Sequence, residues 1–543
     1  YSDGFGREIQ KKIQAEAGPA VEGGPVINPR WVGSGWTIFN NKGKPVRQFE
    51  PFFSATHGFE FGVQVGVSPV LFYDPAERVI ATLHPNHTYE KVVFDPWQQT
   101  TYDVNDTCAA RNAQTGDPRT DPDIGGYVAE YFKSQPANWP TWHAQRIGGA
   151  LGQDERNAAL RAEAHADTPT TAHFDALGRP ILTIAHNRVV CAGHDLDGAE
   201  EHFATRVELD IEGNQRAVFD ERRLPVNDLP TGALEQRIVM RYAYDMLGNR
   251  IHQGSQEAGA RWILNDVAGK PIRAWDSRGH NFTTTYDALR RPTAQTTGGT
   301  SADSDPRTLN RDILADKIEY GESLANAEML NLRTRIYRHS DSAGVATNAR
   351  LGADGNPLEA YDFKGNLLRS TRRLVSDYTG IPDWLLPAEQ QLEAEFFEGS
   401  TRYDALNRPI QSIAPHSSLT RAQHPNKINV VQPVFNEANL LERVDVWLER
   451  AGEPASLLDP NNVAPSPVGV ANIDYDAKGQ RQRIDYKNGA STLYSYDPLT
   501  FRLTQLLTKR KAVDFPGDDP QAVDPDWPRS EEHTSELQSR WII

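Results

Sequence analysis

The feature that most constrains this chain is a short motif that recurs along most of its length. The motif is an aromatic residue, Asp, two variable residues, Gly or a substitute, and then Arg, Asn, Lys or Gln. Four copies keep every part of it: Phe174-Asp175 with Gly178 and Arg179, Tyr244-Asp245 with Gly248 and Asn249, Tyr361-Asp362 with Gly365 and Asn366, and Tyr475-Asp476 with Gly479 and Gln480. A motif repeated in this way predicts one structural unit used many times.

Degenerate copies extend the pattern over further stretches of the chain. Five of them lack the Gly: Tyr73-Asp74, Phe94-Asp95, Tyr286-Asp287, Tyr403-Asp404 and Tyr496-Asp497. Two others change the first position: Asn265-Asp266 with Gly269, and Trp275-Asp276 with Gly279. Four pairs of motif aspartates are 21 residues apart, namely 74 and 95, 245 and 266, 266 and 287, and 476 and 497, and positions 362 and 404 are separated by twice that step. Chance Tyr-Asp dipeptides would show neither the period nor the shared aromatic residue.

The residue types of the motif indicate a strand, a turn and another strand. An aromatic side chain packs well on a sheet face at the end of a strand. Asp accepts hydrogen bonds from the backbone N–H groups of a turn through its side chain, and Gly supplies the left-handed backbone conformation that closes the turn. Because these residues recur with the turn, we interpret the motif aspartates as structural residues and not as catalytic acids.

The clearest single hairpin is predicted around Asn488-Gly489. Residues 481–486 and 492–496 alternate in polarity on either side of this dipeptide, and one face collects Ile484, Tyr486, Thr492, Tyr494 and Tyr496. Asn-Gly between alternating segments is a strong short-range hairpin signal. The sequence therefore predicts a mainly β protein built from such hairpins.

Composition supports this prediction and excludes several classes of function. Gly (41) and Pro (36) are plentiful and Met is rare (3), which favours short strands and many turns over helical bundles. The net charge of −16 disfavours binding to a nucleic-acid backbone. Mean hydropathy is −0.60, and no stretch approaches the roughly 20 apolar residues that span a bilayer, so no membrane span is predicted. The two cysteines, Cys108 and Cys191, predict neither a disulfide framework nor a zinc site.

The motif resembles the YD repeat of RHS proteins, a group that includes polymorphic toxins, the B and C components of insecticidal toxin complexes, and teneurins. Three further stretches are similar to the RHS region of toxin-complex and SpvB-type toxin proteins: residues 36–46, residues 244–292, and residues 435–441. The resemblance implies a long antiparallel sheet of YD-repeat hairpins that spirals into part of a hollow shell, interrupted by a few short helical insertions.

For function, the resemblance implies a secreted or cell-surface toxin protein whose shell encloses a toxic effector. The partners that it implies are the remaining shell and core of the same protein, the enclosed effector, and a pore-forming toxin-complex subunit. The core segment that carries an aspartyl autoprotease site in this family has no match in this sequence. An adhesion module on the same scaffold, binding carbohydrate or protein through its aromatic residues, is the alternative function. Aromatic rings stack on sugars, although core packing explains the same residues.

The motif copies and their interruptions divide the chain. Residues 136–168 are predicted to form a helical insertion, and helical spacing is also read at residues 325–335 and 387–396. These insertions could serve as a docking surface for a partner subunit. The expected divisions are a YD-repeat shell segment (1–135), the helical insertion (136–168), a YD-repeat block (169–300), a shell segment with helical insertions (301–400), a second YD-repeat block (401–510) and a loop (511–528).

Neither end of the sequence is expected to be a natural boundary. No signal peptide is visible after Tyr1, and a missing N-terminal stretch would explain that equally well. Residues 529–539 correspond codon by codon to the in-frame translation of a widely used sequencing-library adapter. We therefore interpret residues 529–543 as adapter-derived and leave them out of the functional reasoning.

Candidate catalytic and metal-binding motifs do not support an enzyme. The segment from His194 to Gly198 lacks the further oxygen ligands of a calcium loop and is interpreted as a solvated turn. His84 and His87 are separated by Pro85, which breaks the helical geometry of a zinc protease motif, and are interpreted as part of a loop. No nucleophile elbow, phosphate-binding loop or dinucleotide fingerprint is present. No catalytic residue, cofactor or metal is predicted.

Overall fold

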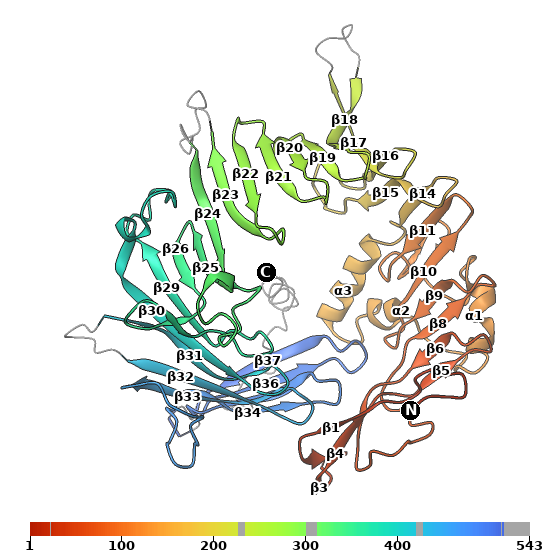
Figure 1. Cartoon of the computed structure of the whole chain (residues 1–543). Helices are drawn as coiled ribbons and strands as arrows, with labels where there is room; N and C mark the ends of the chain where they lie inside the picture. Colours follow the sequence, from red (N-terminus) through yellow and green to blue (C-terminus); the bar gives the residue numbers. More distant parts are fainter. Residues whose placement is uncertain (22, 226–233, 300–311, 420–426, 512, 515–543) are drawn as a thin grey trace. The chain divides into compact units, whose positions relative to one another are not determined.

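The computed structural model describes the chain except for residues 22, 226–233, 300–311, 420–426, 512 and 515–543 (Figure 1). The described chain is mainly β, with 28 strands in extended antiparallel sheet and a few short helices. This agrees with the predicted fold class. The segments expected to be adapter-derived (529–543) and most of the predicted final loop (515–528) lie outside the described residues.

The chain divides into two compact units. Unit 1 is Tyr1–Tyr244 with Gln253–Ala258 and Tyr496–Thr504, and unit 2 is Asp245–His252 with Gly259–Ser495 and Gln505–Ile543, of which 515–543 are not described. Three strands have residues in both units: β19 (Arg250–Ser255), β36 (Ser491–Tyr496) and β37 (Leu503–Lys509). Each unit is described separately below.

Unit 1 contains an antiparallel series of strands in chain order, in which each strand pairs with the next strand of the series. The series is β5 (Thr37–Phe39), β6 (Pro45–Gln48), β8 (Val70–Tyr73), β9 (Val79–Leu83), β10 (Tyr89–Phe94), β11 (Gln98–Tyr102), β14 (Thr170–Phe174), β15 (Pro180–Arg188), β16 (Glu200–Leu209), β17 (Gln215–Pro225) and β18 (Leu234–Tyr244). A three-stranded sheet is formed by β1 (Lys12–Ala15), β4 (Arg30–Gly33) and β7 (Phe52–Ser54), and two short ribbons by β2 (Gly18–Pro19) with β3 (Val26–Ile27) and β12 (Ala110–Arg111) with β13 (Gln114–Thr115).

Unit 2 continues the same pattern of pairing between successive strands. Its strands are β20 (Gly259–Asn265), β21 (Pro271–Asp276), β22 (Asn281–Tyr286), β23 (Pro292–Gly298), β24 (Ile313–Tyr320), β25 (Ile336–Asp341), β26 (Gly344–Thr347), β29 (Arg369–Val375), β30 (Leu392–Tyr403), β31 (Pro409–Ser417), β32 (Ile428–Phe435), β33 (Leu441–Arg450), β34 (Gly469–Tyr475), β35 (Arg481–Tyr486) and β36 (Ser491–Tyr496). A separate ribbon is formed by β27 (Arg350–Leu351) and β28 (Pro357–Glu359).

Hydrophobic core forms in patches where an inserted segment packs on the sheet. In unit 1, Ile124 and Val128 of the segment around helix α1 (Gly125–Phe132) pack with Trp139 against Val70 and Leu83 of the sheet. Figure 1 shows α1 beside these strands. In unit 2, the segment between β29 and β30 contributes Trp384, and the turns before β25 contribute the fully buried Leu332. A sheet that is one layer thick thus buries apolar area by recruiting its own insertions.

Helices α2 (Trp142–Ile147) and α3 (Gln153–Ala164) lie within residues 136–168, where a helical insertion was expected. The other two helical predictions are wrong. Residues 325–335 form turns, with Asn331 and Thr334 in the left-handed region, because this path brings Leu332 into the core. Residues 387–396 contain only the 3₁₀ turn η2 (Ala388–Gln390) before β30 begins, since Leu392 pairs with Val375 and packs beside it.

Two short elements were not predicted. Helix α1 falls in the segment 1–135, which was expected to contain strands, and its first residues are two glycines that weaken the helical signal. The other is the 3₁₀ turn η1 (Gly321–Ser323), which follows β24 directly. In the described residues, no helix combines the length and the apolar character needed to cross a membrane.

Candidate functional site: a ladder of aspartate turns

The motif turns share one hydrogen-bond arrangement, which the turn at Asp175 illustrates. The Gly178 N–H donates to the Asp175 carbonyl (2.9 Å), and the Asp175 N–H donates to the Arg179 carbonyl (3.0 Å). One carboxylate oxygen of Asp175 accepts the backbone N–H groups of Leu177 and Arg179, both at 2.9 Å. Gly178 has φ +75°, so this is a type I turn closed by a left-handed residue and a bulge.

The second carboxylate oxygen binds the side chain four residues after the Asp. Arg179 Nε donates to Asp175 at 2.7 Å, and Asn249 Nδ2 donates to Asp245 at 3.0 Å. The carboxylate therefore joins the turn backbone to the residue just before the next strand. The hydrogen bond from the Arg179 side chain, with backbone hydrogen bonds, holds the pKa of Asp175 below its usual value. This accounts for the Arg or Asn that closes the motif.

The structure places the predicted motif aspartates and glycines at turns, and most of the aromatic residues before them at the ends of strands. The arrangement seen at Asp175 recurs at the motif aspartates of the copies headed by Asp74, Asp245, Asp266, Asp276, Asp287, Asp362, Asp404 and Asp476. Glycines 178, 248, 269, 279, 365 and 479 have positive φ, and the copies without Gly force Glu77, Arg290 and Asn407 into the same conformation. Asp95 closes a turn that is one residue shorter, and Asp497 one that is one residue longer.

The hairpin predicted around Asn488-Gly489 forms between β35 and β36. Ile484 pairs with Thr492, and both are buried, while Tyr486 and Tyr494 pack against the same core patch. Gly489 has φ +85° and donates its N–H to the Tyr486 carbonyl (3.0 Å). The loop is thus the same bulged turn as in the motif, with Asn488 accepting a hydrogen bond from Ala490 N–H.

Sequence reasoning missed several turns of the same kind. They are headed by Asp3, Asn40, Asp210 and Asn436, each of which accepts the N–H of the residue four positions later through its side chain. The first positions of these copies differ, since Asp210 follows Leu209, but Asp or Asn followed by a left-handed residue three positions on is kept. A search for that pair alone would have found them.

The aromatic residue of a turn is tied to the preceding turn. Tyr286 Oη donates to the Pro271 carbonyl (2.7 Å), and Pro271 is the first strand residue after the Asp266 turn. The other links of this kind join Tyr73 to Pro45, Tyr244 to Gln215, Tyr320 to Pro292, Tyr361 to Ile336 and Tyr475 to Leu441. Most of these hydroxyls therefore connect the ends of two paired strands, as Tyr286 of β22 and Pro271 of β21 do, and so link the turns at that edge of the sheet.

Cations from one turn stack on the aromatic ring of another. The guanidinium of Arg291, already bound to Asp287, lies 3.8 Å from the ring centre of Tyr320. Arg78 lies over Phe94 at 4.1 Å and Arg408 over Phe435 at 4.7 Å. Such contacts contribute about 0.5–1 kcal/mol at exposed sites. We call the linked turns within each unit the turn ladder.

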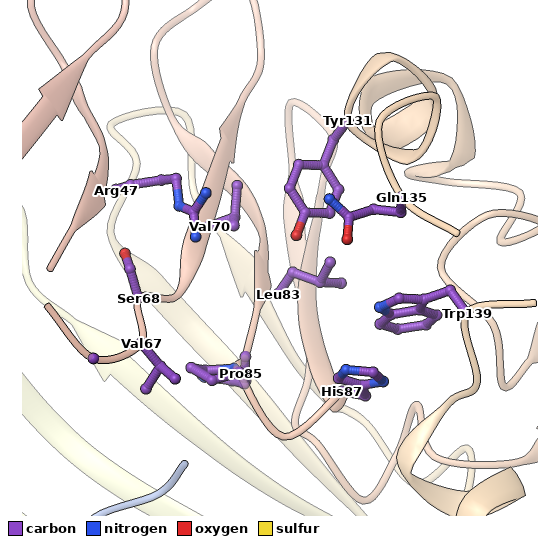
Figure 2. A pocket seen from close by; sticks show the side chains of 12 residues that line it. Arg47, Val67, Ser68, Val70, Leu83, Pro85, His87, Tyr131, Gln135 and Trp139 are labelled. Carbon is purple, nitrogen blue, oxygen red and sulfur yellow. The ribbon is translucent and has the colours of Figure 1, made fainter. Parts of the chain in front are cut away.

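The pocket in unit 1 gathers polar groups without assembling a catalytic set. It is lined by Arg47 and Ser68 on one side and by His87, Gln135 and Trp139 on the other (Figure 2). The His87 ring is stacked on Trp139, with 4.5 Å between ring centres, and its Nδ1 lies 2.6 Å from the Pro140 carbonyl. His87 therefore holds the helical insertion in place.

The loop expected at His84–His87 is one more bulged turn. The His87 N–H donates to the His84 carbonyl at 3.0 Å, and φ of His87 is +69°. Similarly, the segment from His194 to Gly198 is an exposed turn in which Asp197 accepts the Cys191 N–H (2.9 Å). Cys108 is buried and Cys191 is exposed, and both are free thiols.

A buried ion pair lies beneath the pocket strands. Lys91 and Asp121 have no exposed side-chain surface, and Lys91 Nζ lies 3.0 Å from both carboxylate oxygens of Asp121 and 2.5 Å from Asp123. Tyr89 Oη donates to Asp121 at 3.0 Å, and this contact and burial raise the pKa of the Tyr89 phenol, with burial the larger cause. The pair anchors the segment that precedes α1 to β10.

Three side chains of types that can ligate a metal, which sequence reasoning missed, meet on β15 and β16. One nitrogen each from His186 and His202 and one carboxylate oxygen from Glu200 lie within 4.8 Å of one another. His186 is separated from Glu200 and His202 by the loop between the two strands. Only the pairing of β15 with β16 brings the three side chains together. We call His186, Glu200 and His202 the His/Glu cluster.

No family model matches the chain. Two curated toxin subunits of Yersinia entomophaga do. YenC1 is 24% identical over 278 residues, which is 51% of this chain and 25% of YenC1, and YenC2 is 23% identical over 359 residues, which is 63% of this chain and 32% of YenC2. The chain thus spans a quarter to a third of the length of these relatives.

Solved structures resemble the chain over most of its length. A crystal structure of TcdB2-TccC3 without its hypervariable C-terminal region matches 94% of this chain with a TM-score of 0.66 and 20% identity. The match covers 20% of the chain in that structure. A structure of the Photorhabdus luminescens Tc holotoxin pore with a mutated TccC3 matches the same share with a TM-score of 0.66 and 21% identity. The chain is thus similar in sequence to the YenC1 and YenC2 toxin subunits and shares the fold of TcdB2-TccC3, and both findings agree with the resemblance of its aspartate-turn repeat to the YD repeat of toxin-complex RHS proteins.

Proposed function

We propose that this chain is part of the wall of a toxin-complex shell that encloses a toxic effector located C-terminally in the same protein. The observation that carries the proposal is the pairing of successive antiparallel strands through nearly all of the described chain, in a fold shared with TcdB2-TccC3 over 94% of its length. A wall must separate its contents from water and from other chains. Strands that are paired on both sides leave few open edges through which contents could escape or partners could add.

The turn ladder supports a mechanical role of this kind. Its aspartates are bound to backbone N–H groups and to a side chain of their own turn, as at Asp175 and Asp245. Groups already used in this way are not available as general acids or bases. We therefore propose that the motif residues are structural, and that this part of the protein has no active site.

The partners follow from the same proposal. The wall would contact the rest of the shell and core of its own protein, the enclosed effector, and a pore-forming toxin-complex subunit through which the effector leaves. Its place of action would be outside the producing cell or at its surface. One of the structures named above contains TcdB2 with TccC3, and the other is a holotoxin pore with a mutated TccC3, which is the basis for naming these classes of partner.

The adhesion alternative depends on aromatic side chains that are free to bind sugar. The repeated tyrosines do not fit this need, because the hydroxyls of Tyr73, Tyr286 and Tyr475 are donated to backbone carbonyls of neighbouring turns. Their faces are also partly covered by cations, as Lys270 covers Tyr286. Carbohydrate binding therefore receives no specific support from the ladder.

The test is limited proteolysis of the protein expressed from the complete reading frame that contains this chain. Enclosure predicts that a C-terminal region survives in the native protein and is degraded quickly once urea has unfolded the shell. The same region expressed without the shell is the matched control and should be cut rapidly. Equal cleavage rates with and without the shell would contradict the proposal, and specific glycan binding by the chain would favour adhesion instead.

A further inference from the structure

The His/Glu cluster lies on two paired strands of unit 1. His186 of β15 is directly opposite His202 of β16, and Glu200 is opposite Arg188. Residues two positions apart on a strand point to the same face, so Glu200 and His202 share a face and meet His186 there. The two imidazole rings are stacked with 4.3 Å between their centres and an angle of 25° between their planes.

In the cluster, a buried imidazole nitrogen of His186 faces one carboxylate oxygen of Glu200. His186 Nε2 is buried and has no hydrogen-bond partner in the structure, and it lies 3.4 Å from Oε2 of Glu200. Oε1 of Glu200 is bound by the guanidinium of Arg111. One carboxylate oxygen is thus held by a cation, while the other faces the unpaired imidazole nitrogen.

From this geometry we propose that His186, Glu200 and His202 bind a divalent first-row transition ion. Neutral imidazole and carboxylate together suit Zn²⁺, Ni²⁺ or Cu²⁺, whereas Mg²⁺ and Ca²⁺ prefer sites made only of oxygen. A three-ligand site leaves one position for water or for a further ligand. Arg111 would not bind the ion itself, but its hydrogen bond to Glu200 would orient the carboxylate that does.

Side chains in this arrangement could also be an ordinary stacked pair beside a surface carboxylate. That arrangement would leave the buried Nε2 of His186 without a hydrogen bond, its nearest polar group being the Glu200 carboxylate at 3.4 Å, and an unsatisfied buried polar group costs about 1–3 kcal/mol. A metal ion satisfies this nitrogen and also neutralises the carboxylate. The two readings differ in a measurable way, since only the first requires a saturable metal site that depends on all three side chains.

The site would hold the two strands of the β15–β16 hairpin together at its loop end. Beyond the cluster, the chain leaves β15 at Arg188 and returns through an exposed loop that contains Cys191 and is closed by the Val189 N–H donating to the Ala199 carbonyl (3.0 Å). A metal that joins both strands at this point shortens the loop that must be ordered on folding. Binding should therefore raise the temperature at which the chain unfolds.

The experiment is titration of the metal-stripped chain with Zn²⁺, followed by calorimetry and by thermal unfolding. We expect one saturable equivalent and a higher unfolding temperature. His186→Ala, His202→Gln and Glu200→Gln should each weaken binding at least roughly tenfold, in line with the loss seen when even outer groups of a metal site are removed. His173→Ala, on the neighbouring strand, is the matched control and should bind as the unmodified chain does.

Two further measurements make the outcome decisive. Unfolding of each variant in the presence of a chelator should match that of the unmodified chain, so that lost binding is not lost folding. Bound Co²⁺ should show visible bands without a thiolate charge-transfer band, and Cys191→Ser should leave the affinity unchanged. Equal Zn²⁺ affinity in the unmodified chain and the three cluster variants, or affinity that depends on Cys191, would overturn the proposal.

Discussion

At the scale of single residues, the recurring Asp and Gly have separate tasks in the same turn. The aspartate carboxylate collects the N–H groups that a bulged turn leaves unpaired, as Asp476 does for Lys478 and Gln480. The glycine takes the left-handed conformation, which costs other L-residues about 1–2 kcal/mol. Copies that place Glu77 or Arg290 at the glycine position accept this cost.

The cost of the left-handed position can be measured at Gly248. Its φ is +79°, and an added Cβ would meet no atom within 4 Å, so Gly248→Ala changes only the backbone preference. We expect a loss of about 1 kcal/mol in the free energy of unfolding, measured by urea denaturation. Gly126→Ala in helix α1 is the matched control, because its Cβ also enters open space but the helix favours Ala. A loss of similar size at Gly126 would contradict the explanation.

The turn aspartates also predict how stability depends on pH. Hydrogen bonds from Arg179 lower the pKa of Asp175, and the Asn249 side chain is the main cause that lowers the pKa of Asp245. A lowered carboxyl pKa stabilises the folded chain above the unfolded value of 3.8, and this contribution is lost as the pH falls through the folded value. The urea midpoint should therefore be flat from about pH 7 to 5 and fall below about pH 4.

Asp175→Asn provides the control for this pH dependence. It keeps a side-chain oxygen for the turn N–H groups, as Asn40 and Asn436 do in their turns, but it cannot titrate. The variant should be less stable at neutral pH and should lose less stability on acidification. A midpoint that stays constant from pH 5 to 3 in the unmodified chain would show that the turn carboxylates do not contribute.

At the scale of secondary-structure elements, the ladder connects the turns at the ends of neighbouring strands. The hydroxyl of a turn tyrosine reaches the carbonyl that follows the preceding turn, as Tyr475 does at Leu441 (2.7 Å). This bond joins the ends of two strands that also pair with each other, β33 and β34, beyond their ladder of backbone hydrogen bonds. The sheet is therefore held at its turns as well as along its strands.

Removing one tyrosine hydroxyl tests this connection. Tyr475 is buried, so Tyr475→Phe keeps the ring packed with Ile473 and Ile484 and removes only the donor. We expect a loss of about 1 kcal/mol in the free energy of unfolding. Tyr378→Phe is the comparison, because that side chain is 89% exposed. Equal effects of the two substitutions would mean that the hydroxyl link carries no stability.

The buried pair of Lys91 and Asp121 should be costly to break and less costly to replace. Lys91→Met leaves Asp121 as an uncompensated buried charge, and breaking such a pair costs about 3–5 kcal/mol. Lys91→Met combined with Asp121→Leu removes both charges and should cost less than the sum of the two single substitutions. A double-mutant cycle by urea denaturation measures the difference, and additive effects would contradict a direct pairing.

The strands and turns could be predicted from the sequence because their signals are local. Asp245 and Gly248 are three positions apart and act on one turn, so the pattern itself contains the interaction. Residues 325–335 and 387–396 were predicted wrongly because Leu332 and Leu392 are placed by packing on distant strands. The His/Glu cluster depends on the register of β15 and β16, which is set by the whole hairpin and is not visible in any short stretch.

At the scale of the whole molecule, the two units use the same construction. In each, successive strands pair antiparallel, turns close with the same hydrogen bonds, and insertions cover part of the sheet. A construction of this kind can be lengthened by adding repeats without changing what is already built. This repeated construction is suited to a large wall, because every unit uses the same kinds of residue and none depends on a residue found at a single position.

Electron cryo-microscopy of the protein made from the complete reading frame tests the proposed enclosure most directly. The account predicts a map in which the strands described above form part of a continuous wall, with density inside the wall that the wall residues do not explain. A map in which the sheet is open and the C-terminal region extends into solvent would contradict it.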